Sequence, residues 1–178
     1  MEDRDEILGR LSHSGRKTRP PDAATPLPVL SVDALWDLFA RRLESLGGRI
    51  GTLDDLPIVL SRPHVIDIET AARLGRVPGG DPIWEAEVGV TTADLAIAET
   101  GTIVLSTGLG KPRLASLTPS LHVAIVPRSR IVATMAEAMS RLTDRTTVFV
   151  TGPSRTADIE GVIVRGVHGP GDVLVIPV

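Results

Sequence analysis

Three consecutive side chains that can bind an anion follow a Gly-Pro turn late in the chain; they are Ser154, Arg155 and Thr156. The apolar run at residues 148–150 is typical of a buried strand, and the polar residues after the turn predict a short helix with Ser154 as its N-cap. A helix N-terminus exposes unpaired backbone N–H groups, and a guanidinium can bind an oxyanion in bidentate fashion. The segment therefore predicts an anion site that includes Gly152. The alternative is an ordinary strand-turn-helix corner in which Arg155 pairs with a nearby carboxylate.

Glu99 is the second candidate, in the sequence Ala-Glu-Thr-Gly-Thr with Thr100 and Gly101 beside it. Small neighbours allow a backbone segment or a ligand to approach closely, and a desolvated carboxylate suits a general base or a nucleophile. We expect Glu99 and Arg155 to converge at the rim of one sheet, with Thr100 and Gly101 in the ligand-binding set. The alternative is that Glu99 accepts backbone hydrogen bonds in its turn or pairs with an arginine.

His168 is the histidine best placed to face a cleft, because a glycine and a proline follow it and fix the turn. It has no partner at metal-ligand spacing, so no metal site is predicted. The segment Gly-Leu-Gly-Lys at residues 108–111 lacks the residues of a P-loop or a dinucleotide fingerprint. We expect it to be a loop, with Lys111 and Arg113 as candidate contacts to an anionic ligand. His122 lies inside an apolar run and is interpreted as a sheet histidine.

Short apolar runs alternate with helical patterns along the chain, which predicts a mostly parallel, layered α/β sheet. The runs that predict buried strands are residues 57–60, 103–105, 121–126, 147–150 and 173–178. Helical spacing predicts a helix that begins at the cap Ser31 and ends at Gly47-Gly48, and another over residues 129–142. Weaker patterns predict helices at 65–74 and 111–117, a short helix opening at 91–92, and an edge strand at 81–90. Ligands in such sheets bind at the carboxyl ends of the strands.

Composition excludes several classes of function. A length of 178 residues with 42% hydrophobic residues fits one domain, which we place at residues 29–178 after a flexible tail at 1–28. A net charge of −3 and an aromatic content of 2% argue against nucleic-acid binding. The charged N-terminus lacks a signal-peptide pattern, and no apolar run is long enough to span a bilayer, so we expect a cytoplasmic protein without a membrane partner. The chain has no cysteine and cannot itself hold a cysteine-ligated iron–sulfur cluster.

The segments AETGT, LTPSLHVAIVP, GPSRTADIE and GVHGPG together resemble the LUD domain of the lactate-utilization protein C family. The resemblance covers residues 91–178. It implies the three-layer α/β sandwich, with a mostly parallel sheet, of ribose-phosphate isomerases, glucosamine-phosphate deaminases and CoA transferases. It also implies a role in oxidising L-lactate to pyruvate beside two partner subunits that carry iron–sulfur centres, with no cofactor in this chain. The family supplies no settled set of catalytic residues.

Two hypotheses follow. In the first, the chain is a cluster-free accessory subunit that binds a small carboxylate or a phosphorylated ligand and docks to iron–sulfur partners, and it could form a homo-oligomer. Its ligand-binding residues would be Gly152, Ser154, Arg155, Thr156, His168, Thr100 and Gly101. In the alternative, it is a stand-alone enzyme of the isomerase or CoA-transferase type that uses Glu99 as base or nucleophile. The segment from Ala98 to Gly101 is similar to the Ser-Glu-Asn-Gly nucleophile motif of CoA transferases, with a threonine in place of the asparagine.

Overall fold

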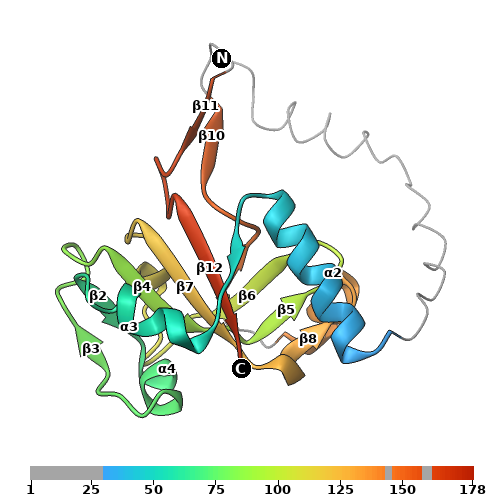
Figure 1. Ribbon diagram of the computed structural model, residues 1–178, viewed down its shortest axis with the longest axis horizontal. Helices are drawn as coiled ribbons and strands as arrows, with labels where there is room; N and C mark the ends of the chain where they lie inside the picture. The colour runs from blue at the N-terminus through green and yellow to red at the C-terminus, as the bar shows by residue number, and fades with distance from the viewer. Residues whose placement is uncertain (1–29, 143–145, 158–161) are drawn as a thin grey trace, which may run out of the picture.

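The computed structural model describes residues 30–142, 146–157 and 162–178 (Figure 1). Within these residues, six strands form one sheet, called sheet A, in the order β1-β12-β7-β4-β2-β3. Its strands are β1 (Arg49–Ile50), β12 (Asp172–Pro177), β7 (Leu121–Val126), β4 (Val88–Thr92), β2 (His64–Ile66) and β3 (Gly79–Gly80). The first five are parallel, and β3 pairs antiparallel at one edge. The α/β class and the mostly parallel sheet are therefore confirmed.

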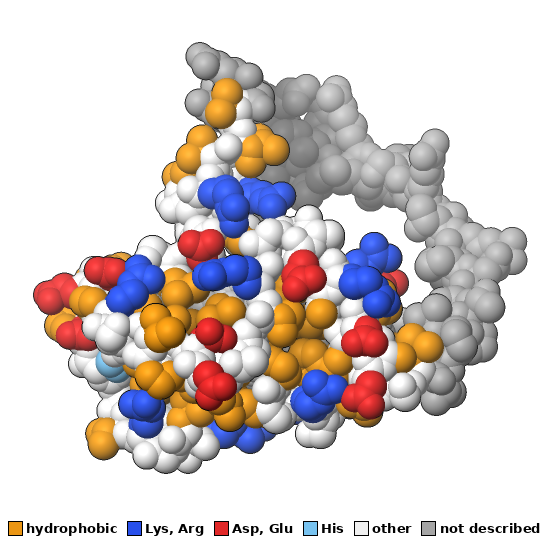
Figure 2. Space-filling view, in the orientation of Figure 1, with side chains coloured by type: hydrophobic (Ala, Val, Ile, Leu, Met, Phe, Trp, Pro, Cys, Tyr) orange, Lys and Arg blue, Asp and Glu red, His pale blue; other side chains and the backbone are white. Residues whose placement is uncertain are grey.

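A second sheet, called sheet B, has the order β8-β5-β6-β9 in the described part of the chain. Its strands are β8 (Ile131–Val132), β5 (Leu95–Ile97), β6 (Thr102–Ser106) and β9 (Thr147–Val150). Beyond it, β10 (Arg155–Ala157) and β11 (Ile163–Arg165) form an antiparallel hairpin, called the hairpin arm, which projects from the rest of the molecule (Figure 1). Figure 2 shows apolar side chains along this arm and positive side chains gathered at its base.

Four α-helices and three 3₁₀ turns complete the described segments. The helices are α2 (Val32–Ser45), α3 (Leu56–Val59), α4 (Ile68–Arg73) and α5 (Met135–Arg141), and the 3₁₀ turns are η1 (Leu53–Asp55), η2 (Arg113–Ser116) and η3 (Arg128–Arg130). Helix α2 begins where the sequence predicts, because the Ser31 hydroxyl accepts a hydrogen bond from Ala34 N. It ends at a glycine with positive φ, Gly47, also as expected.

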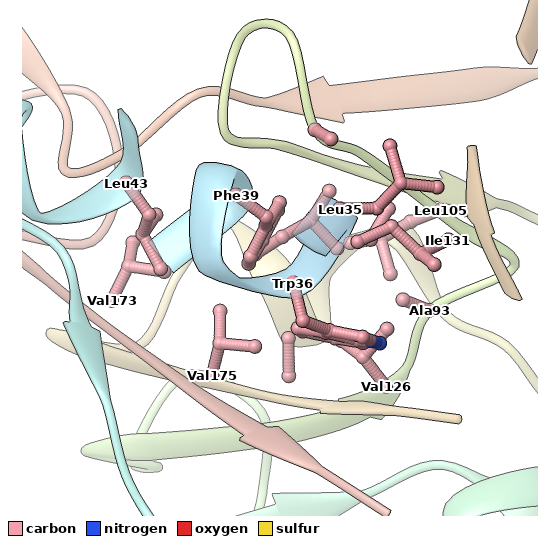
Figure 3. Packing of buried hydrophobic residues seen from close by; sticks show 14 residues of the cluster. Leu35, Trp36, Phe39, Leu43, Ala93, Leu105, Val126, Ile131, Val173 and Val175 are labelled. Atoms are coloured by element: carbon pink, nitrogen blue, oxygen red, sulfur yellow. The ribbon is translucent and has the colours of Figure 1, made fainter. Parts of the chain in front are cut away.

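Sheet A is buried on both faces, as its continuous apolar strands predict. Alternate residues of β7 show this: Val123 and Ile125 pack with α3 and α4, whereas Ala124 and Val126 pack with α2 and sheet B. The molecule therefore has helices α3 and α4 on one side of sheet A, and α2 with sheet B on the other. Figure 3 shows the second of these cores, in which the apolar face of α2 lies against residues of both sheets.

Several predicted elements were wrong. Residues 57–60 are not a strand, because Pro57 opens the short helix α3 after the capped turn η1. Residues 91–92 do not open a helix but end β4, which is a central strand of sheet A rather than an edge strand. The helix predicted over 129–142 begins only at Met135, after η3 and β8. The predicted tail at 1–28 lies outside the described residues.

Candidate functional site

A small polar pocket lies where the carboxyl ends of β2 and β4 in sheet A meet the end of β6 in sheet B. Residues from Lys111 to η2 form part of its wall, and the space inside it, with the solvent at its mouth, is about 260 Å³. We call this site the polar pocket; its lining residues are Asp67, Thr91, Thr92, Leu105, Ser106, Thr107, Lys111, Pro112, Arg113 and Ser116. Its position agrees with the expectation that ligands of such sheets bind beyond the strand ends.

Asp67 fixes the floor of the polar pocket. It follows β2 directly and caps α4, accepting a hydrogen bond from Thr70 N at 2.6 Å, and its second oxygen accepts one from Thr92 N at 3.2 Å. The hydroxyls of Thr70 and Thr92 also share a hydrogen bond at 2.8 Å. Burial raises the pKa of Asp67, because the carboxyl is almost wholly removed from water and its hydrogen bonds only partly offset this effect.

The contribution of Asp67 to the free energy of unfolding is expected to fall as the pH rises. Because its folded-state pKa is raised above 3.8, the folded protein binds this proton more tightly than the unfolded chain does. The contribution is complete below the unfolded pKa and is lost as the pH rises through the folded one. Urea unfolding of wild type and of Asp67→Asn should show that the stability of wild type relative to the variant decreases as the pH rises above about 4. A difference that is constant, or that moves toward wild type, would contradict this reading.

Lys111 is held in an ion cluster beside the polar pocket. Its Nζ lies 2.5 Å from Glu69 Oε2 and 3.1 Å from Asp94 Oδ1, and Arg130 binds the other oxygen of Glu69 at 3.1 Å. Burial alone would lower the pKa of Lys111, but its hydrogen bonds to both carboxylates raise it. Burial would likewise raise the pKa of Glu69, and the two cations lower it instead. The two carboxylates therefore balance the positive charge of Lys111, and the ion pair with Glu69 links the loop of Lys111 to α4.

Arg113 is the cation of the polar pocket that remains available. It lines the pocket from η2, its residue is exposed, and it makes no ion pair or side-chain hydrogen bond with the described residues. Of the two candidate anion contacts that the sequence indicates in this loop, the geometry leaves Arg113 free to bind a ligand, whereas Lys111 is occupied by protein carboxylates.

Thr91 connects the polar pocket to a buried histidine. Thr91 Oγ1 lies 2.8 Å from Nε2 of His122, whose side chain is fully buried in β7. Burial lowers the pKa of His122 to about 4, so the ring is neutral at pH 7. Its Nδ1 has no hydrogen-bond partner among the described residues.

The anion corner predicted at Ser154 has a different structure. No helix begins there: Arg155 and Thr156 lie in β10 and pair with Arg165 and Val164 of β11. The Arg155 guanidinium donates to Leu46 O, and that of Arg165 donates to Gly47 O at 3.4 Å. These two carbonyls end α2, so both arginines stabilise the C-terminus of that helix.

Glu99 does not meet Arg155. Its carboxylate is exposed and accepts a hydrogen bond from Met135 N at 3.1 Å, at the start of α5. The two side chains form no ion pair with each other, and each binds the end of a different helix. The alternative predicted a backbone hydrogen bond to Glu99 from its own turn, whereas the donor observed lies in α5.

Two glycines of the predicted site have a packing role. Gly101 has φ +67°, and a Cβ there would lie 2.5 Å from Leu43 N; Gly152 has φ +83°, and a Cβ would lie 3.0 Å from Leu46 Cβ. Both turns therefore lie directly against α2. Beside them, the hydroxyls of Thr100, Thr102 and Thr151 form a chain of hydrogen bonds at 2.7 and 2.9 Å.

Three of the predicted ligand-binding residues do lie together. Gly152, Ser154 and His168 line an open groove beside β9, called the β9 groove, which also includes Ser116 and Val173. The lining of the β9 groove and of the polar pocket contains none of Arg155, Thr156, Glu99, Thr100 and Gly101. The role of the predicted set in ligand binding stays a prediction.

The sequence interpretation missed most of the polar pocket, namely Asp67, Thr91, Thr92, Ser106, Thr107 and Ser116. A signal for Asp67 was present, since an aspartate between a short β-branched run and a helical pattern is typical of an N-cap. Assigning residues 65–74 wholly to a helix concealed it. In the described part of the chain, no group of three or more His, Cys, Asp or Glu side chains could hold a metal ion. Among the same residues, no helix has the length and apolar character needed to cross a membrane.

Known proteins resemble this chain in both sequence and fold. The lactate utilization protein C of Halalkalibacterium halodurans is 41% identical over 95 residues, which cover 48% of this chain and 41% of that protein. The protein of the same name from Bacillus subtilis is 37% identical over 115 residues, which cover 51% of this chain and 48% of that protein. The chain thus spans less than half the length of these curated relatives.

A solved structure shows the fold. The crystal structure of a DUF162 family protein from Deinococcus radiodurans superposes with a TM-score of 0.61 over 83% of this chain and 98% of that one, at 23% identity. The LUD domain family matches residues 82–178, more than half of the chain, and this match includes every segment on which the sequence resemblance depended. The resemblance is confirmed, and the chain belongs to the LUD domain family.

Proposed function

We propose that this chain takes part in lactate utilization as a subunit that binds a small carboxylate, such as L-lactate or pyruvate, in the polar pocket. The relatives named lactate utilization protein C support the pathway. The pocket supports a small ligand and not a large one, because its space of about 260 Å³ already includes the solvent at its mouth.

The observation that carries the proposal is the unpaired Arg113. It lines the pocket without an ion pair to the described residues, while the neighbouring cation Lys111 is neutralised by Glu69 and Asp94. The side chain of Arg113 and the threonine and serine hydroxyls that line the same pocket are donors that a carboxylate accepts. A phosphorylated ligand shares this chemistry but carries more charge and volume.

The redox step itself is assigned to partner subunits. Oxidation of L-lactate to pyruvate releases two electrons and two protons, so an acceptor must take them up. This chain has no cysteine with which to ligate an iron–sulfur cluster. We propose that iron–sulfur partners accept the electrons, and that this chain supplies ligand binding and docking without a cofactor of its own.

A titration of the full chain with L-lactate, pyruvate, acetate and inorganic phosphate, followed by NMR or calorimetry, tests the proposal. Arg113→Ala should weaken carboxylate binding about tenfold or more, because a charge-assisted hydrogen bond contributes about 1.5–3 kcal/mol. Arg155→Ala is the comparison matched in charge change, and its guanidinium binds α2 outside the pocket.

Two results would count against the polar pocket. Absence of carboxylate binding to wild type at millimolar concentration would contradict the proposed function. If His168→Ala loses carboxylate binding and Arg113→Ala binds as wild type does, the ligand binds in the β9 groove, as the sequence predicts. Saturable binding that depends on Arg113 supports the proposal.

A further inference from the structure

Burial favours one hydrogen-bond direction in the pair formed by His122 and Thr91. The His122 ring is neutral and therefore carries one N–H and one bare nitrogen. Its Nε2 faces Thr91 Oγ1 at 2.8 Å, and its Nδ1 is buried without a partner in the described part of the chain. Two tautomers are open to such a ring, and they differ in which nitrogen lacks a partner.

Burial selects between these tautomers. With the proton on Nδ1, a buried N–H donor would have no acceptor, and orphaned buried N–H groups are rare and costly. With the proton on Nε2, the ring donates to Thr91 Oγ1, and only a lone pair on Nδ1 remains unpaired. The second arrangement costs less, so His122 donates and the Thr91 hydroxyl oxygen accepts.

An accepting hydroxyl still has its own proton to donate. Thr91 is almost wholly buried at the end of β4, and its hydroxyl has no other hydrogen-bond partner among the described residues. The residue lines the polar pocket together with Arg113 and Ser116. The acceptor for the Thr91 proton must therefore come from whatever fills the pocket.

We infer that the Thr91 hydroxyl is a ligand-binding donor in the polar pocket, and that His122 is the positioning residue that keeps it a donor. The inference rests on the proposed function and specifies it further. The ligand presents a hydrogen-bond acceptor at Thr91, and a carboxylate oxygen suits this position while its second oxygen binds Arg113. A group that offers only donors at that position, such as an ammonium, is rejected.

Sheet geometry supports the pairing of these two residues. In the register of β4 with β7, His122 lies opposite Gly89, two residues before Thr91 on the same face of the strand. Gly89 has no side chain, and a Cβ there would lie 1.8 Å from Ala115 O in η2. The absence of a side chain lets η2 pack against this face and enclose the pocket above Thr91.

The first test measures the tautomer without any ligand. The ¹⁵N chemical shifts of the His122 imidazole in the full-length wild-type chain should show a neutral ring protonated at Nε2. A ring protonated at Nδ1 would overturn the inference, because Thr91 would then be donating to the histidine and not to a ligand.

The second test measures binding of acetate and L-lactate. Thr91→Val keeps the shape but removes the hydroxyl, and it should weaken binding about tenfold. Thr91→Ser should recover most of the affinity, and Thr146→Val, an exposed change outside the pocket, supplies the control. Equal binding by wild type and Thr91→Val would overturn the inference while the proposed function stands.

The experiments still distinguish a failure of the inferred contact from a failure of the proposed function when a variant folds poorly or wild type does not bind. If Thr91→Val does not fold, Thr91→Ser and the wild-type tautomer decide, and a tenfold loss in the serine variant would contradict a simple donor role. If wild type binds neither acetate nor L-lactate, the proposed function fails first, and the inferred ligand contact fails with it.

Discussion

Gly89→Ala is expected to destabilise the protein by about 3 kcal/mol or more and to abolish carboxylate binding. Gly89 is buried in the central strand β4, and a Cβ there would lie 1.8 Å from Ala115 O and 2.9 Å from Pro119 Cγ. The nearest obstacle is backbone, so no side-chain rotation can relieve the clash, and overpacking of this severity exceeds the usual 1–3 kcal/mol. Either β4 leaves its neighbours or η2 moves away, and η2 carries Arg113 and Ser116 of the polar pocket.

Urea unfolding and a lactate titration measure the two parts of this prediction. Gly108→Ala is the matched control, because nothing lies within 4 Å of its added Cβ, and its unfolding free energy should change by less than about 0.5 kcal/mol. If Gly89→Ala is as stable as wild type and still binds lactate, then η2 does not pack on β4 as described.

Local signals were sufficient for the elements whose neighbours in sequence determine them. Helix α2 has an N-cap, an apolar stripe and a glycine stop within one segment, and the structure confirms all three. The apolar runs of β7 and β12 were assigned correctly because both strands lie inside sheet A with both faces covered. Residues 57–60 were wrong, since an apolar run with a proline at its start suits a capped helix as well as a strand.

The functional site was harder to predict because it depends on pairing between distant segments. Ser154 had the residue type of an N-cap, but β10 instead pairs with β11, and no local pattern indicates that partner. Asp67 and Thr92 form a hydrogen bond because β2 and β4 are neighbours in sheet A. No local pattern in the sequence indicates this strand order. The structure has a pocket at strand ends, where the sequence leads us to expect a ligand site, but this pocket lies beside β2 and β4 and not at the predicted corner after β9; ligand binding at either place stays a prediction.

Phe39→Ala is expected to lower the free energy of unfolding by about 3–5 kcal/mol, the usual cost of emptying a buried aromatic site. Phe39 is fully buried on α2, and its ring meets the edge of Trp36 with centroids 5.3 Å apart. The cluster around it includes residues from both sheets, among them Val175 of sheet A and Ile131 of sheet B (Figure 3). Removing the ring therefore leaves a cavity at the junction of three elements, which cannot all close on it together.

The packing lost in Phe39→Ala should also destabilise the turns that pack against α2. Gly101 and Gly152 contact the backbone or side chains of its last turns, and Arg155 binds its terminal carbonyl. Amide hydrogen exchange should therefore rise in these turns as well as in the helix, whereas β2 and α4, which pack in the opposite core, should change less. Val32→Ala, at an exposed position of the same helix, should stay within about 0.5 kcal/mol of wild type. A loss below 1 kcal/mol in Phe39→Ala, with exchange unchanged at Gly101 and Gly152, would show that α2 does not hold the two sheets together.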